Sequence, residues 1–481
     1  MEGQNMTTSR TNIDRRDFLV ASGLGILGAS ETFLTAKNKV TAASRPNILV
    51  IMTDQQFAGA MSCAGNPYLK TPAMDKLAED GVLFTNAYCG NPLCVPSRTV
   101  MMTGKMPHET HITTNAGGET KNLKTPMLGR FFADAGYDCG YIGKWHLPVK
   151  EAQADIHGFT WFPKGHAHGK FQDAKVHEAV AEFLHQERDK PFLMVASFYN
   201  PHDICQWARG EALPQSPIPE PPQPDECPPL PDNFAVPENE PEVIRKVQST
   251  FAEVYPSVDW TEDKWRQYRW AYYRLIEKVD VHVGEVMKAL QAAGVADNTL
   301  VVFTADHGDG AAAHHWNQKQ VLYEEAARVP FIVSNQFLTK AGAVDSTHLV
   351  SSGLDLIPTL CDYAGIPVPE GLRGCSVRSL ATGENPTQWR DELVCETEFS
   401  RNSNTTGVTG RMLRTQQYKY IVYSEGTLRE QLFDMENDRG EMQNLAVAPE
   451  KKSVLDDCRK RLARWCTETD DEFQFVAVDA V

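Results

Sequence analysis

Short runs of apolar residues alternate along the chain with segments of helical periodicity. Three runs are almost continuously apolar, as a strand buried on both faces requires: 47–52 (NILVIM), 191–198 (PFLMVASF) and 299–305 (TLVVFTA). Helical patterns separate these runs, and the longest lies at 263–293. Strands that alternate with helices predict an α/β fold with a large, mainly parallel sheet flanked by helices.

A proline-rich segment interrupts this alternation. Residues 214–241 hold 11 of the chain's 29 prolines, too many for a helix or an interior strand. We expect an extended excursion at 211–242, which forms either a wall over a substrate cleft or a surface loop around the domain.

The pattern changes again after residue 390. Short alternating runs at 418–423 and 431–434 precede a last helical pattern at 452–467. We predict a small antiparallel sheet with one helix, and therefore a main domain at 44–390 and a C-terminal subdomain at 391–481.

The first 43 residues resemble a twin-arginine signal peptide. Arg15 and Arg16 precede a weakly apolar stretch and then a run of small residues. The stretch is shorter than the ~20 apolar residues that cross a bilayer, so we expect no stable membrane span in the mature protein. The pattern predicts export by the twin-arginine machinery to the periplasm or the outside of the cell. A disordered basic tail is the alternative.

The formal net charge of −16 argues against a nucleic-acid or anionic-membrane binder, because phosphate binding requires an excess of Lys and Arg. A small anionic ligand needs only a few local cations and is not excluded. The 11 cysteines are an odd number, which leaves at least one thiol to explain in an exported protein.

The pentapeptide Cys94-Val95-Pro96-Ser97-Arg98 has the most specific pattern, and a helical segment follows it. Pro and Ser suit the first turn of a helix and its cap. Cys94 would then lie beside free backbone N–H groups at the positive end of the helix, a place that favours an anion. Arg98 adds a guanidinium suited to a tetrahedral oxyanion. A buried structural cysteine before a helix is the alternative.

Two polar pairs follow two of the predicted strands. Asp54 and Gln55 come after the first apolar run, and Asp306 and His307 come after the run at 299–305. Ligands bind at the carboxyl ends of parallel strands, so these side chains are candidates for one divalent cation. Carboxylate and amide oxygens favour Ca²⁺ or Mg²⁺. Each pair alone is also explained as the start of a loop.

Several further motifs occur in a fixed order: TGKMPH at 103–108, GKWHL at 143–147, NPH at 200–202, TADHG at 304–308, Lys319 with YEE at 323–325, LFD at 432–434, and the segments 414–420 and 438–445. With the pentapeptide they resemble the type I sulfatases of the alkaline-phosphatase-like superfamily. The resemblance runs from residue 47 to about residue 445.

This resemblance implies that a formylglycine-generating maturation enzyme converts Cys94 to formylglycine (3-oxoalanine), whose hydrated aldehyde attacks sulfur. It also implies a metal site, with Ca²⁺ as the expected ion and Mg²⁺ or Mn²⁺ as alternatives. The implied ligands are Asp54, Gln55, Asp306, His307 and the converted Cys94.

The same resemblance implies roles for five other side chains. Arg98 and Lys144 would stabilise the charge of the formylglycine and the sulfate. His146 would take a proton from the second hydroxyl, and His202 with Lys319 would contact sulfate and protonate the leaving oxygen.

Residues outside the implied centre are assigned more loosely. Asp309 would either support the ligands or have no role at the site, and His314 and His315 would lie at the substrate rim or in packing. Rim contacts are expected from the excursion, from 203–209 and from 401–409. Within 203–209, Trp207 and Arg209 either bind a sulfated sugar or pack.

One position departs from the family pattern, since many sulfatases have a second Asp where this chain has Gln55. The prediction is a sulfuric ester hydrolase that acts on a sulfated small molecule or glycan, most simply a carbohydrate. The alternatives are a phosphonate or phosphate ester hydrolase on the same fold, and a non-catalytic binder of sulfated glycans with an unconverted Cys94. Conversion of Cys94 would leave ten cysteines, which pair or remain thiols.

Overall fold

The structure is a computed structural model, which describes residues 45–116, 123–165, 171–215, 217–401 and 404–473. These residues belong to one compact unit that begins at Arg45. The predicted signal peptide at 1–43 lies outside the described residues. Within the described part of the chain, no helix is long and apolar enough to cross a membrane.

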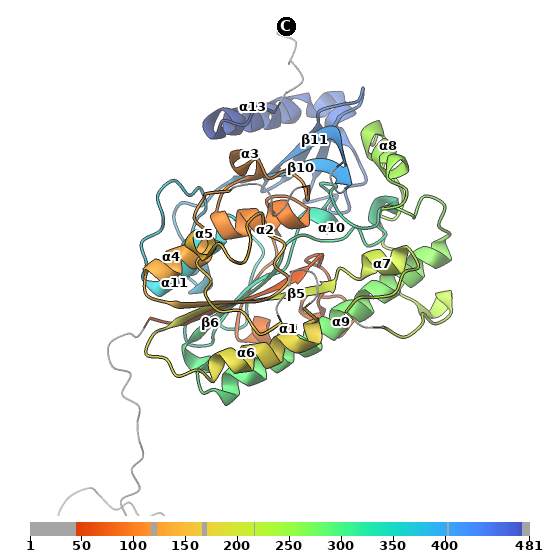
Figure 1. Ribbon diagram of the computed structural model, residues 1–481. Helices are drawn as coiled ribbons and strands as arrows, with labels where there is room; N and C mark the ends of the chain where they lie inside the picture. Colours follow the sequence, from red (N-terminus) through yellow and green to blue (C-terminus); the bar gives the residue numbers. More distant parts are fainter. Residues whose placement is uncertain (1–44, 117–122, 166–170, 216, 402–403, 474–481) are drawn as a thin grey trace, which may run out of the picture. The chain divides into compact units, whose positions relative to one another are not determined.

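A seven-stranded sheet lies at the centre of this unit (Figure 1). Its strands follow the order β4 (Asp138–Gly143), β5 (Phe192–Pro201), β1 (Asn47–Asp54), β6 (Thr299–Ala305), β7 (Phe331–Ser334), β2 (Gly81–Phe84) and β8 (Ala343–Asp345). Among the described strands of this sheet, β7 alone is antiparallel to its neighbours. The predicted mainly parallel sheet is therefore confirmed.

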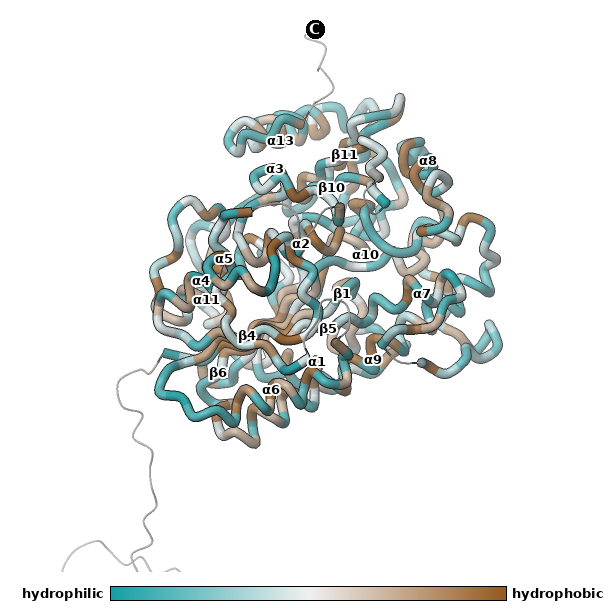
Figure 2. The backbone as a smooth tube through the Cα atoms, viewed as in Figure 1, coloured by the Kyte–Doolittle hydropathy of each residue, from teal (hydrophilic) through white to brown (hydrophobic). Residues whose placement is uncertain are grey.

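Helices cover both faces of the sheet (Figure 1), and hydrophobic residues concentrate in the strands of the sheet between them (Figure 2). Alternate side chains of β1 enter two different cores, because successive residues of a strand point to opposite faces. Leu49 and Ile51 enter the core formed with α1 (Pro72–Glu79), α6 (Val176–Leu184), α7 (Ile204–Ala208) and α9 (Glu262–Ala292). Ile48, Val50 and Met52 enter the core formed with α2 (Cys94–Thr103), α4 (Leu128–Asp134), α5 (Ala154–His157), α11 (Leu356–Ala364) and α12 (Arg378–Ala381).

The proline-rich excursion runs along α9. Ile218, Leu230 and Phe234 pack against the core that contains α9, and the Phe234 ring lies 6.1 Å from that of Trp265. A single 3-10 turn at Pro224–Glu226 is the regular structure described within it. Most of the excursion therefore wraps the domain, while its first residue, Glu211, reaches the cavity described below.

A four-stranded antiparallel sheet follows near the C-terminus, with α13 (Lys452–Thr469) on one face. The other face packs on Tyr88, Trp316 and Tyr323. The strands lie in the order β10 (Glu392–Arg401), β11 (Asn404–Thr415), β12 (Tyr418–Tyr423) and β13 (Glu430–Asp434). This confirms the predicted sheet and helix, whereas the division into domains at residue 390 stays a prediction.

The remaining described elements are short. They are β3 (Ala87–Tyr88), β9 (Val350–Ser351), α3 (Pro107–Thr110), α8 (Glu242–Thr250), α10 (Glu324–Ala327) and 3-10 turns at Ser62–Ala64, Asp173–Lys175, Ala296–Asn298, Ala313–His315, Leu445–Val447 and Pro449–Lys451.

Candidate active site

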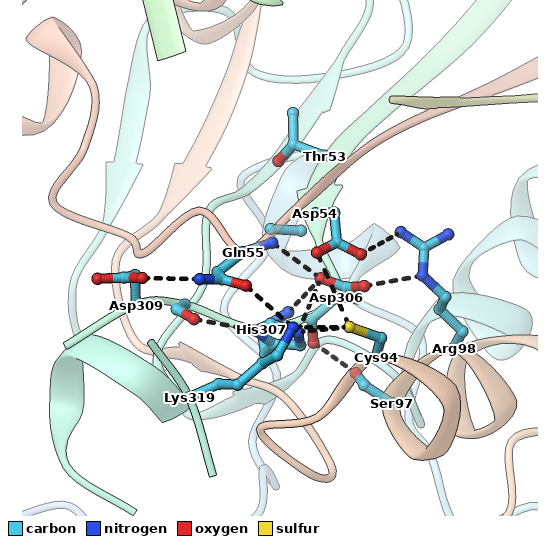
Figure 3. A network of polar contacts seen from close by, with 12 residues as sticks. Thr53, Asp54, Gln55, Cys94, Ser97, Arg98, Asp306, His307, Asp309 and Lys319 are labelled. Atoms are coloured by element: carbon cyan, nitrogen blue, oxygen red, sulfur yellow. Dashed lines mark hydrogen bonds and ion pairs between the residues drawn. The ribbon is translucent and has the colours of Figure 1, made fainter. Parts of the chain in front are cut away.

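The two predicted polar pairs lie side by side at the carboxyl ends of β1 and β6 (Figure 3). β1 and β6 pair in parallel, so Asp54 and Asp306 leave the sheet at the same edge. Gln55 turns the chain with a left-handed φ of 72°, and its backbone N–H donates to Asp306 Oδ1 at 3.1 Å. His307 continues from Asp306 and is fully buried. The structure thus brings both pairs together.

Cys94 is the first residue of α2 and faces the same edge of the sheet. Its Sγ lies 3.0 Å from Lys319 Nζ, 3.2 Å from His307 Nε2 and 3.8 Å from Asp54 Oδ1. The helix start has no side-chain cap. Ser97, expected from the sequence to suit the cap, instead donates its hydroxyl to the backbone carbonyl of Asp306, which ties α2 to the end of β6.

Arg98 and Lys144 neutralise the two buried carboxylates. Arg98 donates from Nε to Asp306 Oδ2 at 2.8 Å and from Nη2 to Asp54 Oδ2 at 3.1 Å, so one guanidinium bridges both acids. Lys144, which follows β4, places Nζ 2.6 Å from Asp54 Oδ2. Burial acts to raise the pKa of Asp54, but Lys144, His202 and Arg98 together hold it well below its ordinary value.

The same cations act on the cysteine. Burial and the neighbouring Asp54 act to raise the pKa of Cys94, yet Lys319, Lys144 and His307 hold it well below its ordinary value. The pocket therefore stabilises negative charge at the position of Sγ. An anionic oxygen attached to residue 94 would meet the same field.

Lys319 and Gln55 are linked to a support behind the site. Lys319 Nζ donates to Gln55 Oε1 at 3.0 Å, and Gln55 Nε2 donates to Asp309 Oδ2 at 2.8 Å. The Tyr268 hydroxyl, on α9, also donates to Asp309, at 2.9 Å. Because Asp309 accepts from the amide N–H, the amide oxygen of Gln55 points toward Lys319.

Two histidines complete the surroundings of Cys94. His146, after β4, is partly buried, and this burial lowers its pKa although its contact with Cys94 acts to raise it. His202, after β5, has a pKa well below its ordinary value because of burial and the charges of Lys144 and Lys319. Both shifts favour the neutral form of the imidazole.

Four of these side chains could hold a metal ion. The ligand atoms of Asp54, Cys94, Asp306 and His307 lie within 4.8 Å of one another, and all four residues are buried. Two carboxylates and one imidazole, with the oxygen of Gln55 beside them, are a donor set that fits a hard divalent cation. The residues present thus fit the metal that the sequence predicted.

A cavity of about 420 Å³ leads to this centre. Its wall includes His202 and Lys319, and residues from all three predicted rim segments also line it. The other lining residues are Leu93, Asn115, Cys205, Arg209, Glu211, Glu253, Val254, Gln318, Gln320, Ser400 and Arg401. Sequence reasoning did not single out Cys205 or Glu253, since an isolated Cys or Glu carries no signal of its own.

Two expected rim residues have other roles. Trp207 packs against Trp260 at 6.4 Å between ring centroids, and Lys264 Nζ covers its ring at 4.1 Å, so Trp207 is a packing residue. His314 is buried and stacks on Tyr323 at 4.0 Å, away from the cavity lining.

Comparison with protein families gives two matches. A family model described as Sulfatase matches residues 46–366, and a model described as N-sulphoglucosamine sulphohydrolase, C-terminal, matches residues 312–468. A Delta 4,5-hexuronate-2-O-sulfatase of Bacteroides thetaiotaomicron is 33% identical, over 95% of this chain and 94% of the relative. An N-acetylglucosamine-6-O-sulfatase of the same organism is 28% identical, over 83% of this chain and 82% of the relative.

Solved structures agree on the fold. A 2-O GAG sulfatase has a TM-score of 0.78 at 31% identity, covering 91% of this chain and 95% of the other. A phosphonate monoester hydrolase of Agrobacterium radiobacter has a TM-score of 0.69 at 21% identity, covering 88% of this chain and 96% of the other. The second likeness concerns the fold alone, so the fold does not separate the two reactions.

Proposed function

The chain belongs to the sulfatase family and is a sulfatase, and from this premise we propose that it releases sulfate from a sulfated carbohydrate with residue 94 as the source of the nucleophile. The observation that carries the proposal is the position of Cys94 Sγ. It lies at a helix start, 3.0 Å from Lys319 and 3.2 Å from His307, in a pocket that stabilises negative charge.

In this proposal Cys94 is converted to formylglycine by a maturation enzyme, and the hydrated aldehyde supplies the nucleophile. A divalent cation, most simply Ca²⁺, would be held by Asp54, Gln55, Asp306 and His307 and would supply Lewis-acid polarisation of the sulfate. The support is the buried set of oxygen and nitrogen donors at the ends of β1 and β6.

The chain's own side chains would orient the ester and move protons. Arg98 and Lys144 hold positive charge next to the sulfate position without any rearrangement, because both are already fixed by Asp54. Lys319, next to Sγ, would bind the sulfate and, with His202, protonate the leaving oxygen. His146, which contacts Cys94 and whose pKa is lowered by burial, would accept the proton of the second hydroxyl.

The substrate class rests on the relatives and on the cavity. Named relatives at 28–33% identity are carbohydrate sulfatases, and the cavity of about 420 Å³ is lined by charged and amide side chains suited to a sugar. A phosphonate or phosphate ester hydrolase is the second candidate, because Gln55 leaves the site with one carboxylate fewer than two adjacent acids would provide.

We also propose export to the periplasm or the exterior by the twin-arginine machinery. The support is the Arg15-Arg16 pair and the apolar stretch after it in the sequence. A folded-state exporter would carry the chain with residue 94 already converted.

Mass spectrometry of the peptide that contains Cys94, from protein made in a host with the maturation enzyme, tests the conversion. We expect formylglycine at residue 94 and turnover of an aryl sulfate that exceeds turnover of the matched phosphate and phosphonate. Cys94→Ala should abolish turnover and leave the thermal unfolding temperature nearly unchanged. The exposed Cys375 provides the control, and Cys375→Ala should be fully active.

Each other outcome has a clear meaning. A dominant phosphonate rate would favour the second candidate. An unmodified thiol together with binding of sulfated glycan and no turnover would favour a non-catalytic binder. Retained turnover in Cys94→Ala would refute the mechanism.

A further inference from the structure

Two arginines line the outer part of the cavity. Arg209 directly follows α7, and Arg401 is the last residue of β10. Their side chains are 27% and 36% exposed, whereas Lys319, which lines the same cavity next to Cys94, is 7% exposed. The cavity therefore runs from a buried cationic end at Lys319 to an open end with two further cations.

Each arginine is held by an exposed glutamate that also lines the cavity. Arg209 donates from Nε and Nη2 to the two carboxylate oxygens of Glu211, at 2.8 and 2.9 Å. Arg401 pairs with Glu253. The glutamate side chains are 52% and 71% exposed. Exposed ion pairs contribute only about 0–1 kcal/mol to stability, so an anionic group of a ligand can replace either glutamate.

The pairing with glutamate shows which kind of group the two guanidinium groups can bind. Glu211 engages Arg209 with both carboxylate oxygens, the geometry in which a guanidinium recognises a carboxylate or a sulfate. A ligand anion in the same place would keep these hydrogen bonds and release the glutamate into water. A neutral sugar hydroxyl offers only one weak acceptor and would leave both pairs intact.

We propose that Arg209 and Arg401 form a second anion subsite, which binds a carboxylate or a second sulfate on the sugar that carries the scissile ester. Glu211 and Glu253 occupy this subsite when no substrate is bound. The preferred substrate is then a polyanionic saccharide and not a neutral sugar with a single sulfate. This inference rests on the proposed function and names the substrate class of the same site.

Steady-state kinetics with matched substrates tests the subsite. The probes are glucose monosulfate, glucuronate sulfated at the same position, glucose with one additional sulfate, and an aryl sulfate. In Arg401→Gln and Arg209→Gln we expect KM for the carboxylate or disulfate probe to rise roughly tenfold, as for a lost hydrogen bond to a charged group. The neutral sugar and the aryl sulfate should change less than twofold.

Two further variants sharpen the test. Glu253→Gln removes a competitor for the subsite and should lower KM for the anionic probes only. Arg378→Gln is the matched control, because Arg378 on α12 also pairs with an exposed carboxylate, that of Asp362 at 3.0 Å, and does not line the cavity. It should change none of the four KM values.

The outcomes separate this inference from the proposed function. No preference of the wild type for an anionic over a matched neutral sugar, or equal changes of KM for both in the arginine variants, would overturn the subsite. If the wild type releases sulfate from no probe, the proposed function fails instead. Calorimetry then tests the subsite alone, by comparing how tightly glucose monosulfate and the matched sulfated glucuronate bind to Cys94→Ala protein. Equal affinities would overturn the subsite. A preference for the glucuronate that depends on the two arginines would support it.

Discussion

Arg98 is the residue on which the two buried acids of the site depend. It bonds Asp306 and Asp54 at once, and all three side chains are fully inaccessible to solvent. Removal of one partner from a buried ion pair leaves an uncompensated charge, which costs far more than the pair itself contributes. The site is therefore stable only with its cations in place.

We expect Arg98→Met to abolish turnover and to lower the free energy of unfolding by about 3–5 kcal/mol in urea titrations with chelator present. Arg378→Met, which removes an exposed partner of Asp362, should cost less than about 1 kcal/mol and leave turnover unchanged. If both variants lower the free energy of unfolding by the same amount, burial of the carboxylates does not control the stability of the site.

Gln55 donates a hydrogen bond to Asp309. This contact explains why the chain has an amide at a position where many sulfatases have a second acid. Gln55 Nε2 is 2.8 Å from Asp309 Oδ2, and Asp309 also accepts from Tyr268 and from the Ala311 N–H. A carboxylate at residue 55 would face another carboxylate in a buried place.

Gln55→Glu should therefore lower the free energy of unfolding by about 1–3 kcal/mol, because a hydrogen bond becomes a repulsion between buried acids. Asp309→Asn in the same chain supplies an amide to the new carboxylate and should restore most of the loss. A urea double-mutant cycle measures this coupling. Additive costs in the double variant would contradict the match between residues 55 and 309.

At the scale of elements, the segment between β6 and α10 positions Lys319 with an unusual backbone. Its left-handed residues that are not glycine are Ala311, Ala312, His314, His315, Gln318 and Gln320. Such conformations cost energy and persist only where surrounding groups hold them. Side chains of α8 fix the segment here: Arg245 donates to the His314 carbonyl at 2.6 Å, and Gln248 donates to the His315 carbonyl at 2.8 Å.

Arg245→Met should release this segment and lower kcat about tenfold to a hundredfold, because a small displacement of a group that acts on the substrate is costly. Lys246→Met is the control on the same helix, since Lys246 is exposed and pairs only loosely with Glu425 at 3.5 Å. Stopped assays with an aryl sulfate measure both. An effect of Lys246→Met as large as that of Arg245→Met would indicate a general disturbance of α8.

The sequence predicted the elements whose burial is uniform or periodic. β6 has the predicted bounds, and α9 lies within one residue of them, because its Trp265, Tyr268 and Tyr272 form one buried face. The antiparallel direction of β7 could not be predicted, because strand direction is set by the crossover and not by the strand's own residues. β10 and β11 belong to the antiparallel sheet that was predicted, but neither strand was identified in the sequence.

The same contrast holds for the site. The ends of β1 and β6 were predicted from their apolar runs, which placed Asp54 and Asp306 at one edge. Lys144, His146 and His202 were found only through the resemblance to a family. The first two follow β4 and the third follows β5, and the residues at these two strand ends carry no metal-ligand pair of their own. Ser97 reaches the Asp306 carbonyl from within α2. Asp309 acts through the left-handed residues Gln55 and Ala311, and nothing in the local sequence specifies that backbone.

On the scale of the whole molecule, His108 connects the segment after α2 with both parts of the C-terminal region. Its Nδ1 lies 2.5 Å from Glu396 on β10, and its Nε2 lies 3.0 Å from the carbonyl of Thr469 at the end of α13. Burial acts to lower the pKa of His108, but Glu396 and then Asp471 raise it above its ordinary value. Protonated His108 therefore joins α3 to both the C-terminal sheet and α13.

A raised pKa in the folded state fixes the sign of the pH dependence. The stability that His108 contributes is fully present below the unfolded pKa of about 6.5 and is lost as the pH rises through the higher folded value. We expect His108→Gln to reduce the free energy of unfolding most below pH 6.5, with a deficit that shrinks steadily toward pH 9. Urea titrations across this range measure it, and His185→Gln, on an exposed histidine whose Nδ1 lies 2.7 Å from the Ala181 carbonyl of its own helix, is the control and should show a small deficit. A His108→Gln deficit that is constant with pH would mean that the contact stabilises through packing on Trp465 and not through charge.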